Sequence, residues 1–416
     1  MDVFVARQPI FDANSRVRAY ELLYRSADTP SFDGAELEPT SKLLVNAALT
    51  VGLDTLTSGR PAHINFSGPD LVRGFPLLLP PHSLVVEVLE TVEPSPDVLA
   101  ACRELRSKGY TLALDDVDQL GPEHRGLLEL VDIVKVDFLA TDAVQRRRLA
   151  TDCRGRELLA EKVETFDDFT QARWLGYTRF QGFFFCRPNV VAGRDVPAHH
   201  LSSMRLMREV CRPEVDLAAV ELMIKADVAL SYKLLRYVNS AAFGWRRRIE
   251  ALRPALVALG EAELRRWVSM VCLGGISQHK PLEMAVQCLI RAHFCEALGA
   301  LSGLWLKSAD LFLVGLFSGL DALLNLPLER CLEQVPLPDP VRAALAAGEG
   351  PMGTILGAVL AYERGAWDEA QARADELGIE VARIPETYVH AVQLADSMFA
   401  SEEPQAPAGA RRPAGQ

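Results

Sequence analysis

The sequence has no Cys-x-x-Cys pair among its eight cysteines, and it shows no targeting or membrane segment. Its first residues, Met1–Arg7, lack the basic start and the long apolar core of a signal peptide. The most apolar stretch, Leu311–Leu326, is interrupted by Asp321 and falls short of the roughly 20 apolar residues of a membrane span. We therefore expect reduced thiols in a cytoplasmic protein that does not enter a membrane.

Basic residues are also in deficit, because the formal net charge is −11. This excess of acid argues against a broad nucleic-acid or anionic-membrane surface and leaves room for a local basic pocket only. With 416 residues, of which 49% are hydrophobic, the chain is too long for one ordinary core. Two domains are therefore expected.

The two halves of the chain differ in their hydrophobic pattern. In the first half, short apolar runs alternate with helical patterns, which predicts a mainly parallel sheet closed as a TIM-like α/β barrel. The second half is helical throughout, and after residue 400 the composition collapses to Glu, Pro, Ala, Gly and Arg. We place a barrel domain at residues 1–197, an all-α domain at 198–400 and a disordered tail at 401–416, with a hinge within 188–200.

The expected elements can be given by residue number. Strands are predicted at residues 3–5, 18–24, 62–66, 84–88, 111–114, 133–136 and 158–161. Helices are predicted at residues 96–108, 214–226, 231–240, 261–271, 284–301 and 310–324.

The barrel half is organised around an apolar run, Tyr110–Leu114, that ends in the adjacent carboxylates Asp115 and Asp116. Such a run is typical of a buried parallel strand, and barrel folds place their chemistry at the carboxyl ends of such strands. Because neighbouring strand residues point to opposite faces, the two acids can act together only where the strand ends. The alternative is a pair of solvated turn aspartates, which is the usual explanation of an isolated Asp-Asp.

Polar residues recur on or just after the other apolar runs of this half: Glu21, Asn65, Glu87, Glu90, Lys135, Glu161, Glu164 and Gln181. A carboxylate on an apolar strand is costly to bury unless it is paired or binds a metal. Several carboxylates at one barrel mouth would repel one another without a cation, and oxygen-rich groups suit Mg²⁺, Mn²⁺ or Ca²⁺. Lys135 would neutralise part of this charge. Each residue taken alone is better explained as a structural pair or a surface charge.

These residues, taken in order, resemble the EAL domain family. Tyr20–Arg25 is similar to the signature that names the family, with Leu22 in place of its Ala. Asn65, Glu87-x-x-Glu90, Leu114–Asp116, Val134–Asp137, Ala160–Thr165 and Gln181–Phe184 follow in the family's order. The resemblance covers about residues 3–190. It implies a modified TIM barrel that hydrolyses cyclic di-GMP to linear pGpG with Mg²⁺ or Mn²⁺.

The resemblance also implies a role for each residue. Metal ligands would be Glu21, Asn65, Glu87 and Asp115, with Asp116 serving a second metal. Lys135 and Glu161 would be catalytic, because Lys135 would orient the attacking water and Glu161 would hold metal or water. Arg25 would contact a substrate phosphate, Gln181 would support substrate binding, and Glu90 and Glu164 would support the site. Two metals would clamp the attacking and leaving oxygens of the phosphodiester.

Three departures from the family pattern lie around the predicted site. Family members follow the two aspartates with a Gly-rich loop that shapes the site and a dimer contact, whereas this chain has Val117 and Asp118 there. The backbone is expected to be stiffer without those glycines. Lys162 replaces the glycine of the family's Glu-Gly-Val-Glu pattern. The segment between Glu21 and Asn65 is also shorter than usual.

The second half resembles the HDOD domain, a helical relative of the HD phosphohydrolases, over about residues 200–395. The resemblance is carried by Ile224–Ala241 and by Ala255–Gly260. Ser318 and Gly319 stand where active HD enzymes have their metal-binding His-Asp pair, and they cannot bind a catalytic metal. His279, His293 and His390 lack metal spacing and are expected to be surface or capped histidines. The residues Arg236, Asn239, Trp245 and Arg246–Arg248 form either a binding surface or a solvated helix end.

The whole chain thus resembles a bacterial EAL–HDOD signalling protein. One hypothesis is a non-enzymatic scaffold, in which a degenerate EAL domain binds nucleotide or a protein partner and the HDOD domain relays the signal by protein contact. The other is a working cyclic di-GMP phosphodiesterase. The altered loop after Asp116 favours the first, so we expect little hydrolysis, whereas the intact ligand set favours the second. A homodimer is left open, and nucleic-acid binding through Arg246–Arg248 is disfavoured by the acidic charge.

Overall fold

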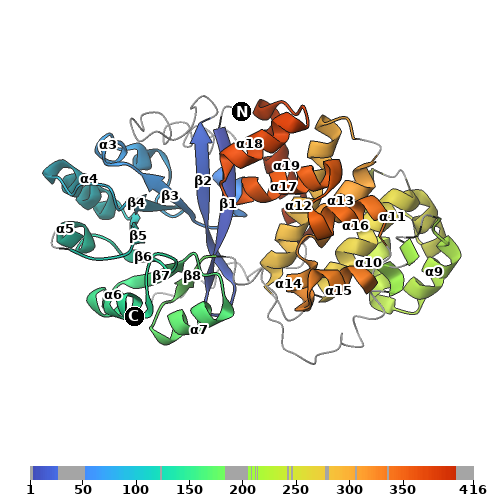
Figure 1. Ribbon diagram of the computed structural model, residues 1–416, viewed down its shortest axis with the longest axis horizontal. Helices are drawn as coiled ribbons and strands as arrows, with labels where there is room; N and C mark the ends of the chain where they lie inside the picture. The colour runs from blue at the N-terminus through green and yellow to red at the C-terminus, as the bar shows by residue number, and fades with distance from the viewer. Residues whose placement is uncertain are drawn as a thin grey trace, which may run out of the picture.

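The computed structural model describes most of both halves of the chain. The described residues are 3–26, 52–121, 124–182, 205–207, 209–210, 212, 214–240, 243–244, 247–276, 281–304, 307–334 and 337–399. Within them, eight strands close into a barrel, and helices make up the second half (Figure 1). The predicted combination of an α/β barrel and an all-α region is therefore confirmed.

The barrel strands follow one another in chain order. They are β1 Val3–Asp12, β2 Val17–Ser26, β3 Ala62–Phe66, β4 Leu84–Val88, β5 Thr111–Val117, β6 Ile133–Asp137, β7 Glu157–Glu161 and β8 Arg179–Phe180. Strands β2 to β8 pair in parallel, whereas β1 is antiparallel to both of its neighbours, β2 and β8. The reversed direction of β1 was not predicted. The strand β8 was also not predicted, because a strand of two residues shows no hydrophobic pattern in the sequence.

The helices of the barrel half lie between successive strands. They are α2 Leu53–Thr57, α3 Gly68–Val72, η1 Phe75–Leu78, α4 Pro96–Ser107, α5 Arg125–Leu128, α6 Ala143–Asp152 and α7 Phe166–Trp174. Helix α4 illustrates the local signals: the hydroxyl of Ser95 accepts a hydrogen bond from the N–H of Val98 at its start. Gly109, with φ +88°, supplies the left-handed residue after its end.

The second half is a helical bundle. Its elements are α9 Leu217–Lys225, α10 Val228–Val238, α11 Leu252–Ile276, α12 Leu282–Leu301, α13 Ser308–Phe317, α14 Leu320–Leu324, α15 Leu328–Gln334, α16 Asp339–Ala347, α17 Gly350–Glu363, α18 Trp367–Glu376, η6 Val381–Arg383 and α19 Ile384–Phe399. The single helix predicted at residues 310–324 is wrong, because the chain breaks at Ser318 and Gly319 into α13 and α14. The backbone N–H of Ser318 and its hydroxyl both bond the carbonyl of Gly315, which ends the regular helical ladder.

Helix α12 is the central helix of the bundle. By length and composition alone it is long and apolar enough to cross a membrane, and so is the bent pair α16–α17 if the two helices are taken together. The expectation that no apolar stretch approaches that length overlooked α12, because Glu283 and Arg291 interrupt it in the sequence. Helix α12 is mostly buried inside the protein, where it packs against α13, α17 and α19.

The two halves are in contact along β1. Helices α17 and α19 pack against this strand, as Figure 1 shows. The hydroxyl of Tyr362 bonds both the N–H and the carbonyl of Val5, and the hydroxyl of Tyr388 accepts from the N–H of Arg7. The guanidinium of Arg7 pairs with both oxygens of Asp396 at 3.0 Å. One cluster of buried apolar residues therefore continues from the barrel into the bundle. A second, separate cluster contains Ile10, Ala19, Val85, Ala113, Ile133 and Leu159.

The domain boundaries stay predictions. The hinge at residues 188–200 and the tail at 401–416 lie outside the described residues.

Candidate active site

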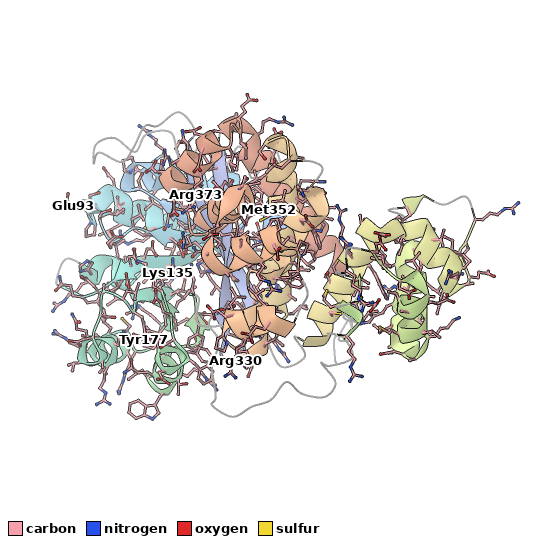
Figure 2. All side chains as sticks on the ribbon, turned by 45° about the vertical axis from the view of Figure 1, so that its right-hand side comes forward. Glu93, Lys135, Tyr177, Arg330, Met352 and Arg373 are labelled. Atoms are coloured by element: carbon pink, nitrogen blue, oxygen red, sulfur yellow. The ribbon has the colours of Figure 1, made fainter. Side chains whose placement is uncertain are left out.

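Lys135 lies at the centre of the barrel, on β6, and is fully buried (Figure 2). Its Nζ atom is 2.6 Å from Asp115 Oδ1 and 2.7 Å from Glu87 Oε1. It is also 2.8 Å from Glu161 Oε1 and 3.4 Å from Glu21 Oε2. Four strands thus bring four predicted site carboxylates around one predicted site lysine.

The charges of this group do not balance. Burial opposes the charged ammonium, but the four carboxylates raise the pKa of Lys135 well above its ordinary value. Burial raises the pKa of Glu87 and of Glu161 well above the usual range, and Lys135 only partly opposes this. One buried ammonium cannot compensate four carboxylates.

A divalent cation fits this donor set. Carboxylate and amide oxygens are the ligands that Mg²⁺, Mn²⁺ and Ca²⁺ prefer, and an added cation would offset the uncompensated charge. Glu161 Oε2 is buried and has no hydrogen-bond partner within the described residues, and the same holds for Gln181 Oε1. Both atoms can therefore accept a further ligand or a water molecule.

Two amides complete the interior of the site. Asn65 lies on β3, and its Nδ2 donates to Glu21 Oε1 at 3.3 Å. With its amide flipped, the nitrogen instead lies 3.0 Å from Asp115 Oδ2 and 3.1 Å from Glu87 Oε2. The Nε2 of Gln181, just after β8, donates to Glu21 Oε2 at 2.7 Å and to Gln8 Oε1 at 3.0 Å. The structure therefore brings both amides to the carboxylates.

The Asp115–Asp116 pair lies at an irregular end of strand β5. The register of β5 against β6 shifts between Leu114 and Val117, and Asp116 has a left-handed φ of +46°. This bulge changes the direction in which the second acid points. One carboxylate oxygen each of Glu90, Asp115 and Asp116 lies within 4.8 Å of the others, a spacing that could hold a metal ion.

Lys162 follows β7 directly and carries a left-handed φ of +51°. This conformation costs a non-glycine residue roughly 1 kcal/mol. The Nζ of Lys162 is 2.8 Å from Asp116 Oδ1 and 2.6 Å from Asp137 Oδ2. Burial opposes its charge, but the hydrogen bonds to the two aspartates raise the pKa of Lys162 above its ordinary value. A second ammonium group therefore lies at the edge of the site.

Two predicted residues stand apart from the Lys135 group. Arg25, at the end of β2, has its Nη1 2.5 Å from Asp368 Oδ1 on α18, so the predicted phosphate ligand is paired with the helical half. Glu164 is half-buried in the turn before α7. Their predicted roles, like those of the other site residues, stay predictions.

Two further members of the site were missed in the sequence. The Nδ1 of His63 lies 2.7 Å from Glu87 Oε1, and burial together with Lys135 lowers the pKa of His63 well below its ordinary value. Asp137 is the partner of Lys162. Both could have been found by alternation, because His63 precedes Asn65 by two residues and Asp137 follows Lys135 by two, on the same faces of β3 and β6.

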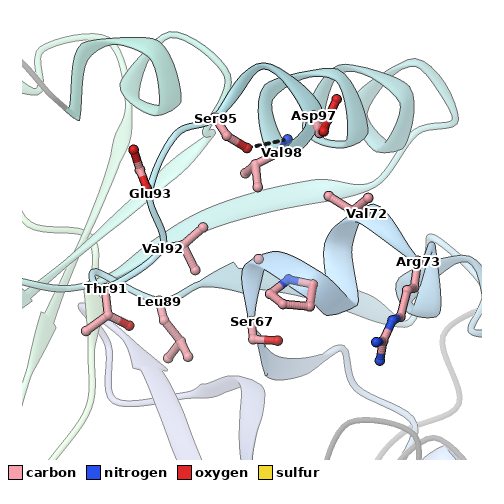
Figure 3. Close-up of a pocket in the computed structure, with 12 residues that line it drawn as sticks. Ser67, Val72, Arg73, Leu89, Thr91, Val92, Glu93, Ser95, Asp97 and Val98 are labelled. Atoms are coloured by element: carbon pink, nitrogen blue, oxygen red, sulfur yellow. Dashed lines mark hydrogen bonds between the residues drawn. The ribbon is translucent and has the colours of Figure 1, made fainter. Parts of the chain in front are cut away.

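A groove of about 570 Å³ lies in the barrel half. It lies between α3 and the connection from β4 to α4, and Figure 3 shows Ser67, Leu89 and Val92 among the residues that line it. Leu89 and Thr91 flank Glu90 in the sequence, but Glu90 itself is not among the residues that line the groove.

The helical half shows no comparable group at the position where an HD enzyme would hold metal. The hydroxyl of Ser318 accepts from Arg291 Nη1 at 3.3 Å. A side-chain carbon at Gly319 would lie 2.9 Å from Cys288 Sγ, so the position is closed by packing. The prediction that this Ser-Gly pair does not bind a metal stays a prediction.

The other predictions for the helical half have mixed outcomes. The amide of Asn239 bonds the carbonyls of Leu235 and Ile249 and the N–H of Ile249, which is a structural role. The expectation of a surface or capped His293 is wrong, because α12 buries it beside Phe312 with its Nε2 unpartnered among the described residues. His390 is exposed. Arg236, Arg247 and Arg248 are exposed, whereas Trp245, Arg246 and His279 lie outside the described residues.

Comparison with known proteins identifies the class of this chain. A family model for the HDOD domain matches residues 196–326. The chain is 40% identical over 396 residues to a protein of Vibrio cholerae named cyclic di-GMP phosphodiesterase CdgJ, covering 93% of this chain and 91% of that protein. It is 34% identical to the uncharacterized protein YuxH of Bacillus subtilis, over 94% of this chain and 98% of that one. The chain therefore belongs to the EAL–HDOD family of bacterial signalling proteins.

Solved structures with an EAL domain are also similar to it. The Bacillus subtilis YkuI protein, solved in complex with cyclic di-GMP and calcium, matches with 19% identity and a TM-score of 0.39, over 64% of this chain and 72% of that one. Klebsiella pneumoniae BlrP1, solved in a calcium and cyclic di-GMP complex, matches with 24% identity and a TM-score of 0.36, over 45% and 56% of the two chains.

Proposed function

We propose that this protein is a divalent-cation-dependent phosphodiesterase that hydrolyses cyclic di-GMP to linear pGpG. The observation that carries the proposal is the convergence of Glu21, Glu87, Asp115 and Glu161 around Lys135. The name of the Vibrio cholerae relative, which is 40% identical over nearly the whole chain, supports the same reaction. This proposal differs from the expectation of little hydrolysis that the loop after Asp116 suggested.

The donor set assigns roles within this reaction. Glu21, Asn65, Glu87 and Asp115 would hold the ion, either Mg²⁺ or Mn²⁺, which when bound supplies Lewis-acid stabilisation of the phosphodiester and a more acidic water. Glu161 would accept a hydrogen bond from an attacking water through its unpartnered Oε2 and so orient it. Lys135 keeps the carboxylates together and adds positive charge where negative charge develops on phosphate oxygens.

The groove lined by Leu89 and Thr91, the sequence neighbours of Glu90, is the proposed place for part of the substrate. Ligand pockets commonly measure about 300–1,000 Å³, and the groove volume of about 570 Å³ falls within that range. Its lining by Leu89, Val92 and Val98 offers apolar contacts for a flat nucleobase. Gln181 and Arg25 are the proposed polar contacts to the substrate.

A second candidate function is a nucleotide-binding scaffold without turnover. It is favoured by the lysine bound to Asp116 and by the loss of the family's glycines after that residue. In both cases we propose a cytoplasmic protein. We also propose that its HDOD domain acts through protein contacts and not through a metal, because its Ser318–Gly319 position is closed by packing.

Purified full-length protein incubated with cyclic di-GMP and Mn²⁺ separates the two functions. We expect linear pGpG, detected by chromatography, and a rate at least about a hundredfold lower for Glu21→Gln, since a charged ligand is lost. Glu157→Gln is the matched control, because Glu157 opens β7 and pairs with Arg179 away from Lys135. Binding of cyclic di-GMP without pGpG formation would support the scaffold and contradict the enzyme.

Removal of the ion gives a further measurement. Because the folded barrel holds the ion and the unfolded chain does not, Mn²⁺ at about a hundred times its dissociation constant should add about 2.7 kcal/mol of stability. We expect a melting temperature several degrees lower in EDTA, and a smaller difference for Glu21→Gln. An identical melting temperature with and without Mn²⁺ would argue against a metal site.

A further inference from the structure

The position of Lys162 is not explained by packing. Its side chain is 45% exposed and its backbone is held in the left-handed region, where glycine is the residue without strain. The contacts that the structure shows for the side chain are polar: Asp116 Oδ1 at 2.8 Å and Asp137 Oδ2 at 2.6 Å. A strained backbone that persists at a functional site indicates a role for the side chain.

Asp137 holds this ammonium group in place. The carboxylate lies at the end of β6, and its Oδ1 accepts the N–H groups of Leu139 at 2.6 Å and Ala140 at 2.9 Å. Its Oδ2 accepts from Lys162. Asp137 is therefore fixed by the backbone on one oxygen and presents the other to Lys162, so the ammonium does not depend on Asp116 alone for its position.

The place that Lys162 takes is one where a metal ion could lie. Asp116 belongs to the group of carboxylate oxygens with Glu90 and Asp115 that lie within 4.8 Å of one another. An ion bound to Asp116 would lie within a few ångströms of Lys162 Nζ, and like charges at that separation repel strongly where water is partly excluded. The ammonium and an ion therefore compete for Asp116.

We propose that Lys162 is a tethered cation that takes the place of a second divalent ion at Asp116, so that the barrel binds one divalent ion instead of two. That one ion lies among Glu21, Glu87 and Asp115, where Lys135 leaves negative charge uncompensated. The inference rests on the proposed function only in requiring that the barrel binds a divalent ion, and it does not require hydrolysis.

The test is the number of Mn²⁺ ions bound per full-length chain, measured by calorimetric titration and by electron paramagnetic resonance of free Mn²⁺. We expect one ion for the wild type and two for Lys162→Met, which removes the charge, and for Lys162→Gly, which also removes the strain. Lys162→Arg keeps the charge and is expected to bind one. Lys108→Met is the control, because Lys108 pairs with Glu104 on the outside of the barrel, and it is expected to bind one.

A second substitution locates the added ion. Asp116→Ala in the Lys162→Met protein should return the number from two to one, whereas Asp116→Ala alone should leave it at one. Two tightly bound ions in the wild type, or one ion in Lys162→Met, would overturn the inference. One ion in the wild type, two in Lys162→Met and no pGpG from either would support the inference and remove the enzymatic function; no Mn²⁺ bound by any of these proteins would overturn both.

Discussion

Buried charge is arranged differently at the mouth of the barrel and in the helical half. At the barrel mouth one ammonium, Lys135, faces four carboxylates. In the helical half Arg291 Nε faces Glu363 Oε2 at 2.8 Å, one cation to one anion, with both side chains nearly buried. Arg7 and Asp396 form a similar one-to-one pair between the halves.

The difference separates two uses of charge. A one-to-one pair balances its own charge and can specify how helices pack, whatever its net contribution to stability. A group with an excess of one sign can be stable only if protons or an external cation compensate it. The imbalance at the barrel mouth therefore points to a binding site, and the balance in the bundle points to structure.

The largest effect is expected from Lys135→Met. The four carboxylates would lose the ammonium group that contacts all of them, so we expect hydrolysis to fall about a thousandfold. The variant should also depend more on Mn²⁺ for its melting temperature than the wild type does. Initial rates and thermal melts with and without Mn²⁺ measure both. A variant that retains most of the rate would show that the acids need no ammonium.

The balanced pair should behave in the opposite way. Arg291→Met leaves the buried Glu363 without this partner and should cost about 3–5 kcal/mol of unfolding free energy, with no recovery on adding Mn²⁺. The double change Arg291→Met with Glu363→Leu should recover most of that loss, since no buried charge is left unpaired. Urea unfolding of the three proteins measures this. If Mn²⁺ restored the unfolding free energy of Arg291→Met, the helical half would respond to the ion as the barrel does, which would contradict the proposed difference between the two regions.

His293 predicts how the helical half responds to acid. Burial, with Arg266 and His390 nearby, lowers the pKa of His293 to about 4 from the ordinary value of 6.5. As the pH falls below 6.5, His293 becomes protonated in the unfolded chain but stays neutral in the folded chain until about pH 4. Stability is therefore lost between these two pH values. Between pH 7 and pH 5 the loss is about 2 kcal/mol. Urea unfolding should show it for the wild type and show less for His293→Gln; equal pH dependence would contradict the assignment.

The smallest effect on stability is expected at the exposed ion pair between the halves. Asp368 is 70% exposed, so Asp368→Asn should change the unfolding free energy by less than about 1 kcal/mol. The substitution weakens the ion pair between Asp368 and Arg25 and so leaves Arg25 freer to contact the substrate. We therefore expect a lower KM for cyclic di-GMP with an unchanged kcat. Steady-state kinetics measure the split. An unchanged KM would indicate that Arg25 does not contact the substrate.

Much of the barrel could be predicted because its strands are buried on both faces and give continuous apolar runs. The bounds of β3 and β4 were predicted to the residue, and the polar residues on the strands pointed to one mouth. The role of Lys162 could not be predicted, because its partners come from β5 and β6 and its backbone conformation is set by the closed barrel. The pairing of Arg25 with Asp368 could not be predicted either, since 343 positions separate them.

The contacts of β1 have a consequence for the order in which the chain folds. Arg7 belongs to the first strand and Asp396 to the last helix, 389 positions later, and Tyr362 and Tyr388 bond the same strand. During synthesis the barrel residues leave the ribosome before the helices that cover β1 exist. The contacts of β1 with Tyr362, Tyr388 and Asp396 can therefore form only after those residues are synthesised. Contacts between residues so distant in sequence form slowly. Strand β1 is thus synthesised before the other strands but acquires its helical contacts after them.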